Sequence, residues 1–485
     1  MNEDHSDDMD AEDRRLCSAC IAEPYLKAEV TAANDQQPCF YCQKQGPTIA
    51  VRDLADRLEA VFSEFYVRTP SEAEGLDYYI QKETGEWYRD GEPVIDLIQD
   101  LAGVSEEAAS DLQLVLDERT SDFDSSSTGE EQPFDSEAMY EEIAEIDHSF
   151  LSKQFREFER LLKEESRFFS PIAREILDSI FSGLDEHRTR DGNSVIVKAG
   201  PGLPISNFFR ARVFQEKEKL RQATMFPDSQ LGSPPRLTSS AGRMNALGVS
   251  VFYGADNPMT ALSEVRPPVG SQTLVASFRL LRPVRLLDVD ALQRLLVSGS
   301  LFDPSYASRL SHARFLGVLS ERITRSVLPD HERFEYLATQ AIADYLANEV
   351  QPPIDGILYR SVQHGNDAKN VVLFHKAARV ASLELPPGTV VDATFGYSTD
   401  EGFEVDYEVA EMVSEVKKPV DEPDYRPMSP LPLMLDDEVV EPDPRPLTLR
   451  IDLDTVVVHH VEAVQFTTSA FSVTRRRHSK KDWKF

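Results

Sequence analysis

Three arginines, a tyrosine and a glutamate lie close together near the middle of the chain, and their types suit a site for a phosphorylated ligand. They are Arg210, Arg212, Arg243, Tyr253 and Glu264. Residues 207–214 alternate as a β-strand does, so Arg210 and Arg212 are expected on the same face. Each guanidinium offers paired N–H donors and keeps its charge in a cleft. The pair therefore predicts an anion site, with ordinary surface arginines on an exposed strand as the alternative.

Three later segments place polar side chains on predicted elements. Residues 335–340 (EYLATQ) start a predicted helix, whereas residues 356–361 (GILYRS) and 369–374 (KNVVLF) predict strands that carry Ser361 and Asn370. No motif places a histidine base beside Ser361. This serine is therefore interpreted as a binding group and not as a nucleophile.

The order of these segments resembles that of the RES family, which is named for an arginine, a glutamate and a serine. The segments FFRARVF, GRMN and MTALSEVR match the first part of the family pattern, and GILYRS and KNVVLF match the second. The resemblance covers about residues 200–375. RES domains resemble ADP-ribosyltransferase toxins in fold and break down NAD, typically by phosphorolysis. The resemblance therefore implies an α+β domain that uses NAD+ and inorganic phosphate as substrates and releases nicotinamide and ADP-ribose phosphate.

The resemblance also implies a role for each residue. Glu264 is expected to stabilise the positive charge that develops on the ribose as nicotinamide leaves, and Tyr253 to stack against the nicotinamide ring. Met244 stands where the family has an aromatic residue, which weakens any stacking role at that position. The expected catalytic residues are Glu264, Arg243 and Tyr253, and the expected substrate-binding residues are Arg210, Arg212, Ser361, Tyr336 and Asn370.

Other interpretations of this region stay open. Water or a protein side chain could replace phosphate as the acceptor, which would make the protein an NAD glycohydrolase or an ADP-ribosyltransferase. The RES-like region could instead be an inactive interaction module. Because loss of NAD harms a cell, the family implies a toxin-like or defence role, as in bacterial toxin-antitoxin systems. Such a role implies a neutralising antitoxin or immunity partner.

All four cysteines form one pattern, Cys17-x-x-Cys20 and Cys39-x-x-Cys42. Each pair lets two thiolates converge on one ion, and two pairs complete a closed tetrahedral site, as in a zinc ribbon. A structural zinc ion would hold together an N-terminal segment too small to fold on a core of its own. The alternatives are a redox-active dithiol pair and unligated core cysteines.

Residues 46–185 are predicted to form an all-α domain. Apolar spacing and capping residues predict helices over 49–65, from Ser105, over 136–168 and from Ser170 to near Gly183. This stretch resembles the helical N-terminal domain, related to HEPN nucleases, that accompanies some RES domains. HEPN RNases use an arginine followed at short spacing by a histidine, and this pairing is missing at His148 and His187. The domain is therefore expected to be a scaffold without activity of its own.

The composition excludes several classes of function. The net charge of −33 disfavours a duplex-DNA-binding protein, because nucleic-acid phosphates are repelled. A membrane span and a secretory signal are both missing from the sequence, so a cytoplasmic location is expected. The predicted organisation is an acidic N-terminus with a zinc ribbon (1–45), a helical domain (46–185), a RES domain (195–395), an acidic proline-rich linker (396–447), and a strand pair with a basic tail (448–485).

Overall fold

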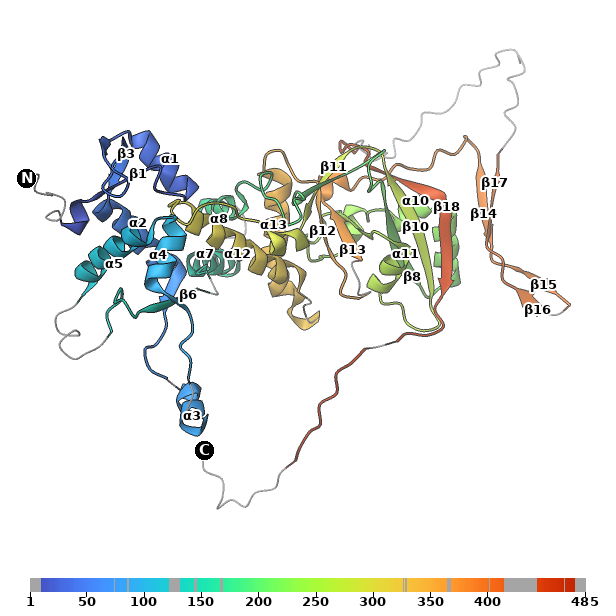
Figure 1. The fold of residues 1–485 in the computed structure, drawn as a ribbon. Coiled ribbons are helices and arrows are strands. Elements are labelled where there is room, and N and C mark those ends of the chain that lie inside the picture. Colours follow the sequence, from blue (N-terminus) through green and yellow to red (C-terminus); the bar gives the residue numbers. More distant parts are fainter. Residues whose placement is uncertain are drawn as a thin grey trace, which may run out of the picture. The chain divides into compact units, whose positions relative to one another are not determined.

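The computed structural model describes residues 10–73, 75–84, 87–121, 131–143, 146–165, 169–325, 327, 329–363, 368–400, 402–413, 443–465 and 467–475. The chain forms two compact units, each assembled from segments that are far apart in the sequence (Figure 1). Unit 1 comprises Met1–Leu161, Asp178–Ser194 and Ala291–Arg322. Unit 2 comprises Leu162–Leu177, Val195–Asp290 and Ile323–Phe485.

Within the described residues, unit 1 combines helices with two small antiparallel sheets. The first has the order β1-β3-β2 and consists of Arg15–Cys17, Gln45–Ala50 and Gln36–Pro38. The second has the order β4-β6-β5 and consists of Tyr66–Arg68, Met139–Glu142 and Glu92–Pro93. The helices are α1 (Pro24–Ala33), α2 (Val51–Phe65), α3 (Gly75–Thr84), α4 (Val94–Ala102), α5 (Glu106–Thr120), α7 (Ser149–Arg160) and most of α12 (Tyr306–Thr324).

The amphipathic pattern predicted for residues 49–65 is confirmed. Helix α2 buries its whole apolar stripe in the core of unit 1, together with the apolar faces of α4 and α5. Helix α5 begins where predicted, because the Ser105 Oγ accepts a hydrogen bond from the Ala108 N–H at 3.4 Å. Helix α8 (Pro171–Phe181) likewise follows Ser170, whose Oγ accepts from the Ala173 N–H at 3.2 Å.

The long helix predicted over 136–168 is wrong. Residues Met139–Glu142 form strand β6, and α7 begins only at Ser149. Tyr140 on β6 packs against Phe62 and Phe134, with ring centroids 4.8 and 5.9 Å away. Burial of this ring and pairing with β4 and β5 outweigh the local helical spacing of the apolar residues. The region 46–185 is therefore not all-helical.

Unit 2 is built on an eight-stranded mixed sheet with the order β18-β10-β8-β9-β13-β12-β11-β7. In that order the strands are Leu449–His460, Gln272–Leu280, Asn207–Phe214, Phe252–Ala255, Lys369–Leu373, Gly356–Arg360, Val284–Asp288 and Ile196–Ala199. Strands β11 and β12 are parallel, and the other pairs are antiparallel. The helices include α9 (Lys217–Met225), α10 (Pro227–Leu231), α11 (Pro258–Glu264) and α13 (Glu332–Asn348). The unit is α+β, as predicted for this region.

The sheet opens between β8 and β9. Strands β8 and β10 pair along their whole length, whereas the pairing of β8 with β9 is confined to Phe209 and Ala255 in the described part of the chain. Strand β9 starts only at Phe252, because the preceding loop closes on itself through a 2.8 Å bond from the Ser239 Oγ to the Val249 carbonyl. Helix α11 packs its apolar side, including Ala261 and Val265, against β8 and β9.

The chain returns to the sheet near its C-terminal end as one strand, whereas two were predicted over 448–473. Strand β18 pairs with β10 up to His460, which lies opposite Gln272, the first residue of β10. Residues beyond His460 therefore have no β10 residue to pair with. Before β18, β14 (Val390–Thr394) pairs with β17 (Glu408–Met412), and β15 (Tyr397–Thr399) with β16 (Gly402–Glu404). Most of the predicted proline-rich linker and of the basic tail lies outside the described residues.

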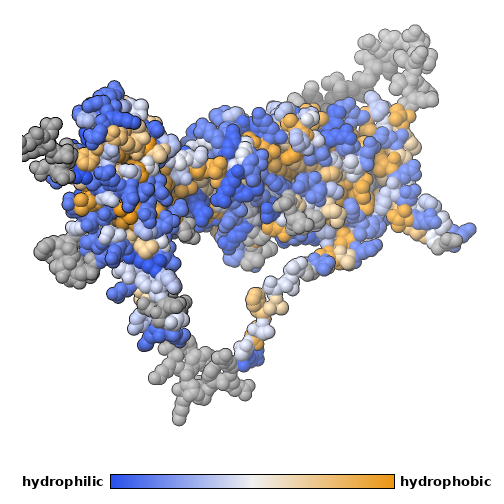
Figure 2. Space-filling model, in the orientation of Figure 1, coloured by the Kyte–Doolittle hydropathy of each residue, from blue (hydrophilic) through white to orange (hydrophobic). Residues whose placement is uncertain are grey.

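Apolar surface is exposed among polar residues over β14, β17 and β18 (Figure 2). Val390, Met412 and Val457 are each 49–58% exposed there. No helix in the described ranges combines the length and the apolar content that a membrane crossing requires.

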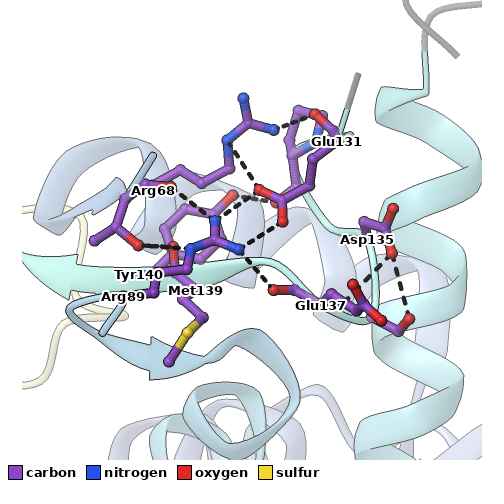
Figure 3. Close-up of polar contacts among 10 residues, drawn as sticks. Arg68, Arg89, Glu131, Asp135, Glu137, Met139 and Tyr140 are labelled. Carbon is purple, nitrogen blue, oxygen red and sulfur yellow. Dashed lines mark hydrogen bonds and ion pairs between the residues drawn. The ribbon is translucent and has the colours of Figure 1, made fainter. Parts of the chain in front are cut away.

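Arg89 is the centre of a polar cluster that closes the second sheet of unit 1 (Figure 3). Its two terminal nitrogens each donate to the Glu131 carboxylate at 2.6 Å, and they also reach the carbonyl oxygens of Glu137 at 2.9 Å and Thr69 at 2.7 Å. The side chains of Arg89 and Glu131 are 13% and 12% exposed. The pair therefore joins β4 to the segment that leads into β6 in a largely dry environment.

We predict that Arg89→Ala lowers the free energy of unfolding of unit 1 by about 2–3 kcal/mol, because it removes both short hydrogen bonds to the Glu131 carboxylate and leaves this carboxylate with the Arg68 Nε at 4.0 Å. Arg89→Lys keeps the charge but loses the paired geometry, so an intermediate loss is expected. Urea unfolding followed by tryptophan fluorescence measures both. Arg52→Ala, which breaks an exposed pair with Asp13, is the matched control and should cost about 0–1 kcal/mol. Equal losses in the Arg89→Ala and Arg52→Ala proteins would contradict the prediction.

His187 is a second polar group that unit 1 places in a poorly hydrated environment. Its ring centroid lies 5.7 Å from that of His312, and its Nε2 is buried without a hydrogen-bond partner among the residues described. Burial, and to a smaller extent the charge of His312, lowers the pKa of His187 below its usual 6.5. The folded protein therefore favours the neutral imidazole.

We predict that acid weakens the wild-type protein more than it weakens His187→Gln. Below pH 6.5 the unfolded chain takes up a proton that the folded protein resists, so this part of the stability is complete above pH 6.5 and is lost as the pH falls through the lower folded-state pKa. Urea unfolding between about pH 7.5 and about pH 5 measures how steeply the free energy of unfolding of each protein falls with pH. The same dependence on pH in both proteins would show that His187 contributes nothing to the loss of stability in acid.

Candidate functional site

A cavity of about 250 Å³ in unit 2 collects side chains from β8, β9, α11, β12 and β13. Its lining consists of Arg210, Ala211, Tyr253, Gly254, Ala261, Glu264, Val265, Tyr359 and Asn370. The register of the sheet explains why residues of β9, β12 and β13 lie together, because Asn370 lies opposite Tyr359 on one side and opposite Ala255 on the other. Opposed residues of antiparallel strands present their side chains on one face. Four residues predicted for a site, Arg210, Tyr253, Glu264 and Asn370, line this cavity together.

Glu264 is held at the cavity by two side-chain donors. It is the last residue of α11, whose start is capped by Asn257 through a 2.8 Å bond from the Thr260 N–H. The Glu264 Oε1 accepts hydrogen bonds from the Ser361 Oγ at 2.5 Å and from the Asn370 Nδ2 at 2.8 Å. Because both donors are buried, the carboxylate enters the cavity in a fixed orientation.

Arg210 supplies a positive charge that no described carboxylate pairs with. Its Nη1 is buried without a hydrogen-bond partner, and its guanidinium carbon lies 5.1 Å from the centre of the Phe252 ring. Burial, and then the nearby charge of Arg212, lowers the pKa of Arg210 to about 10, so the side chain stays charged at neutral pH. A buried cation without a counter-charge favours the binding of an anion.

The hydroxyl of Tyr253 is already engaged by the loop that precedes β9. It donates to the Asn245 Oδ1 at 2.9 Å and accepts from the Met244 N–H at 3.1 Å. Glycine is required at position 242, because an added Cβ would lie 2.6 Å from the Tyr253 hydroxyl oxygen. Burial raises the pKa of Tyr253 to about 12, so the phenol is neutral at physiological pH. The ring of Tyr253 is therefore the part available to a ligand.

Helix α13 fixes the loop that orients Tyr253. The Gln340 Nε2 donates to the carbonyl oxygens of Gly242 and Asn245 at 2.8 and 3.0 Å. The Thr339 Oγ1 donates to the Arg243 carbonyl at 2.6 Å. Both side chains come from the middle of α13, and not from the start of a helix as predicted. They satisfy backbone carbonyls of a tight turn and so brace the site indirectly.

Four residues predicted for the site do not line this cavity: Arg212, Arg243, Tyr336 and Ser361. The Arg212 Nη1 donates to the Gln230 carbonyl on α10 at 2.8 Å. The Arg243 Nη1 donates to the Ile323 carbonyl at 2.7 Å, and its guanidinium carbon lies 5.7 Å from the centre of the Tyr336 ring. Arg210 and Arg212 thus do not converge on one anion site. An arginine side chain is long enough for two residues of one strand face to reach different neighbours.

Two residues of the site are not among the predicted ones. Tyr359 lines the cavity opposite Asn370, and burial, with Tyr253 and Glu264 nearby, raises its pKa. The alternation of Tyr359 with Ser361 on a predicted strand is the signal that could have found it. Asn245 is the last residue of the GRMN segment, which is the signal that could have found it, but its contact with Tyr253 forms only when the loop folds back on β9.

The four cysteines form a second candidate site, in unit 1. Their Sγ atoms all lie within 4.8 Å of one another, and those of Cys17 and Cys42 are 3.5 Å apart. Thiolates around a tetrahedral zinc ion at about 2.3 Å would be about 3.8 Å apart. Burial raises the pKa of Cys20 and Cys39, whereas the backbone N–H of Lys44 lowers the pKa of Cys42 to about 7, so Cys42 is the thiol of these three that ionises most readily. The four residues therefore fit a metal ion.

Asp111 on α5 ties the cysteine segment to the rest of unit 1. It accepts from the Tyr41 hydroxyl at 2.6 Å and from the Arg14 Nη1 at 2.8 and 2.9 Å. Leu16 and Ile21 of the segment are buried in the same core as α2, α4 and α5. The cysteine cluster therefore lies next to the core of unit 1, with Cys17 and Cys39 buried and Cys20 and Cys42 half-buried.

Comparison with known proteins gives one positive result. No curated protein and no solved structure matches the chain. The family model of the RES domain matches residues 209–396, a range that includes every residue lining the cavity.

Proposed function

We propose that the cavity cleaves the bond between nicotinamide and ribose in NAD+, with inorganic phosphate as the acceptor. The observation that carries the proposal is that Glu264, anchored by two hydrogen bonds, and Arg210, without an acidic partner, line the same cavity. The match to the RES domain supports NAD as the substrate, because this family is associated with enzymes that act on NAD. The products would be nicotinamide and ADP-ribose phosphate.

The chemistry requires stabilisation of positive charge on the ribose. As the glycosidic bond lengthens, its electron pair goes to the nicotinamide nitrogen and charge develops on the ribose carbon. The Glu264 carboxylate stabilises this charge more than it stabilises the uncharged ribose of the substrate. A phosphate oxygen then forms the new bond. Nicotinamide leaves as a neutral ring and needs no proton, in keeping with a Tyr253 hydroxyl that is engaged elsewhere.

The size of the cavity suits one half of the dinucleotide. Ligand sites usually measure about 300–1,000 Å³, and this one measures about 250 Å³. It would hold the nicotinamide ribose against the Tyr253 ring, with the remainder of NAD+ extending outside. Arg210 would bind a phosphate group, either of NAD+ or of the acceptor.

Hydrolysis of NAD+ is a second candidate reaction. Arg212 and Arg243, which the sequence assigns to anion binding and catalysis, do not line the cavity. Arg210 is therefore the one arginine among the described lining residues, and binding of the substrate pyrophosphate by Arg210 would leave water as the acceptor. Either reaction would deplete NAD, so a toxin-like role with a neutralising partner remains part of the proposal.

We predict that Glu264→Gln slows NAD+ breakdown by about 10²–10³-fold, because it removes the negative charge while keeping the shape of the side chain. Purified full-length protein is incubated with NAD+, with and without phosphate, and the products are identified by mass spectrometry. Glu335→Gln, an exposed glutamate on α13, is the matched control and should keep the wild-type rate.

The outcomes of this experiment separate the proposed reaction, its acceptor and its carboxylate. Intact NAD+ under both conditions would refute the proposal. Breakdown at the same rate without phosphate, with ADP-ribose as the product, would favour hydrolysis over phosphorolysis. An undiminished rate in Glu264→Gln would assign the reaction to another carboxylate.

We further propose that the four cysteines bind a structural zinc ion. Four thiolates within 4.8 Å of one another complete a tetrahedron and leave no position for a substrate. The ion would hold the turns after β1 and β2 together, next to the core of unit 1.

We predict about one zinc ion per wild-type chain and less than about a tenth of that in Cys39→Ser, because a hydroxyl is a poor substitute for a thiolate at a closed zinc site. Elemental analysis gives the metal content, and hydrogen exchange of residues 15–50 should rise in the variant. Thr31→Ser, on the exposed side of α1, is the control. Wild-type protein that contains disulfides in place of zinc would contradict the proposal.

A further inference from the structure

Both side chains that contact Glu264 donate to the same oxygen. An ionised carboxylate accepts hydrogen bonds and donates none, so the Ser361 hydroxyl donates a hydrogen bond to Oε1 and Asn370 turns its NH₂ group toward the same oxygen. The carboxylate thereby fixes the amide orientation of Asn370. The Oε2 of Glu264 receives no hydrogen bond from the described residues. The two oxygens of Glu264 therefore differ in their environment.

Ser361 has no second proton with which to bind a phosphate or a ribose oxygen. Its single proton is directed at Glu264, and its oxygen accepts from the Gln363 N–H at 3.3 Å. The residue is 2% exposed and does not line the cavity. Its contact with the site is through Glu264.

The two donors come from adjacent strands, which makes the anchoring rigid. Asn370 lies in β13 and Ser361 follows β12, and the Ser361 N–H donates to the Ala368 carbonyl at 2.8 Å. Strand β13 also holds the other end of α11, since the Lys369 N–H donates to the Asp256 Oδ2 at 3.0 Å. Asp256 lies just before α11, and Glu264 is its last residue. Both ends of this seven-residue helix are therefore tied to β13.

We infer that Ser361 and Asn370 are positioning residues that act through Glu264, holding Oε1 so that Oε2 is the oxygen that faces the developing ribose cation. The inference rests on the proposed function and replaces the substrate-binding role that the sequence suggests for these two residues. Ser361 and Asn370 are thereby expected to affect the rate of the chemical step and not the affinity for NAD+ or phosphate.

Steady-state kinetics separates positioning from binding. Ser361→Ala and Asn370→Leu are each expected to lower kcat by about 10–100-fold, the range for a lost hydrogen bond to a charged group, while KM for NAD+ and for phosphate changes less than about threefold. Ser361→Thr keeps the hydroxyl and should recover most of kcat. Ser277→Ala, at a serine of β10 that is 3% exposed, accepts from the Asn207 Nδ2 and does not line the cavity, is the control for loss of a buried hydroxyl and should leave kcat unchanged.

A double-mutant cycle tests whether the effect passes through Glu264. In the Glu264→Gln background, Ser361→Ala should change the residual rate less than about twofold, because the group it positions has lost its charge. A full, additive loss in the double variant would overturn the inference. A higher KM for phosphate at unchanged kcat in Ser361→Ala would also overturn it, and so would a Ser361→Thr protein as slow as Ser361→Ala.

The inference and the proposed function can fail separately. Wild-type protein that leaves NAD+ intact would refute the proposed function and the role of Oε2 toward a ribose cation, but not the positioning of Glu264 by Ser361 and Asn370. In that case a crystal structure of the wild type tests the positioning, because the inference requires that Ser361 and Asn370 both donate to one oxygen of Glu264. A Glu264 side chain turned away from Ser361 and Asn370 would overturn it whatever the activity, whereas loss of the ordered orientation in Ser361→Ala would support it.

Discussion

The antiparallel register of β9, β13 and β12 is the constraint on which the cavity depends. It sets Asn370 between Tyr359 and Ala255, and Val372 opposite Tyr253, so that the polar and aromatic side chains of three strands share one face. A shift of one residue in any of these strands would turn its side chains to the other face. The position of Glu264 follows from the same register, because α11 is tied to β13 at both ends.

The charges of the site are kept apart. Glu264 is anchored by a hydroxyl and an amide, which are neutral, and Arg210 has no described carboxylate as a partner. A direct ion pair between Arg210 and Glu264 would partly cancel both charges and leave less for a ligand. The arrangement therefore leaves a carboxyl group and a guanidinium group at one cavity that do not neutralise each other, in surroundings that screen charge poorly.

The two units are interleaved along the chain. The range that matches the RES domain includes Ala291–Arg322, which belongs to unit 1 and places Phe302 in its core. Unit 1 is further held by the Arg89–Glu131 pair and by the contacts of Asp111 with the cysteine segment. A fragment confined to residues 209–396 would expose Phe302, because the core residues around it lie in the first half of the chain.

The sequence by itself determined the features that depend on neighbours along the chain. Helix α2, the caps of α5 and α11, strand β8 and the grouping of the four cysteines all follow from local spacing and capping. Tertiary structure decided the rest. Residues 139–142 form a strand because the Tyr140 ring packs into a core, Arg212 and Arg243 donate to carbonyl groups outside the cavity, and Ser361 donates a hydrogen bond to Glu264. Periodicity tells which face of an element a side chain leaves from, but the partner of a long or polar side chain depends on groups that only the folded chain brings within hydrogen-bonding distance.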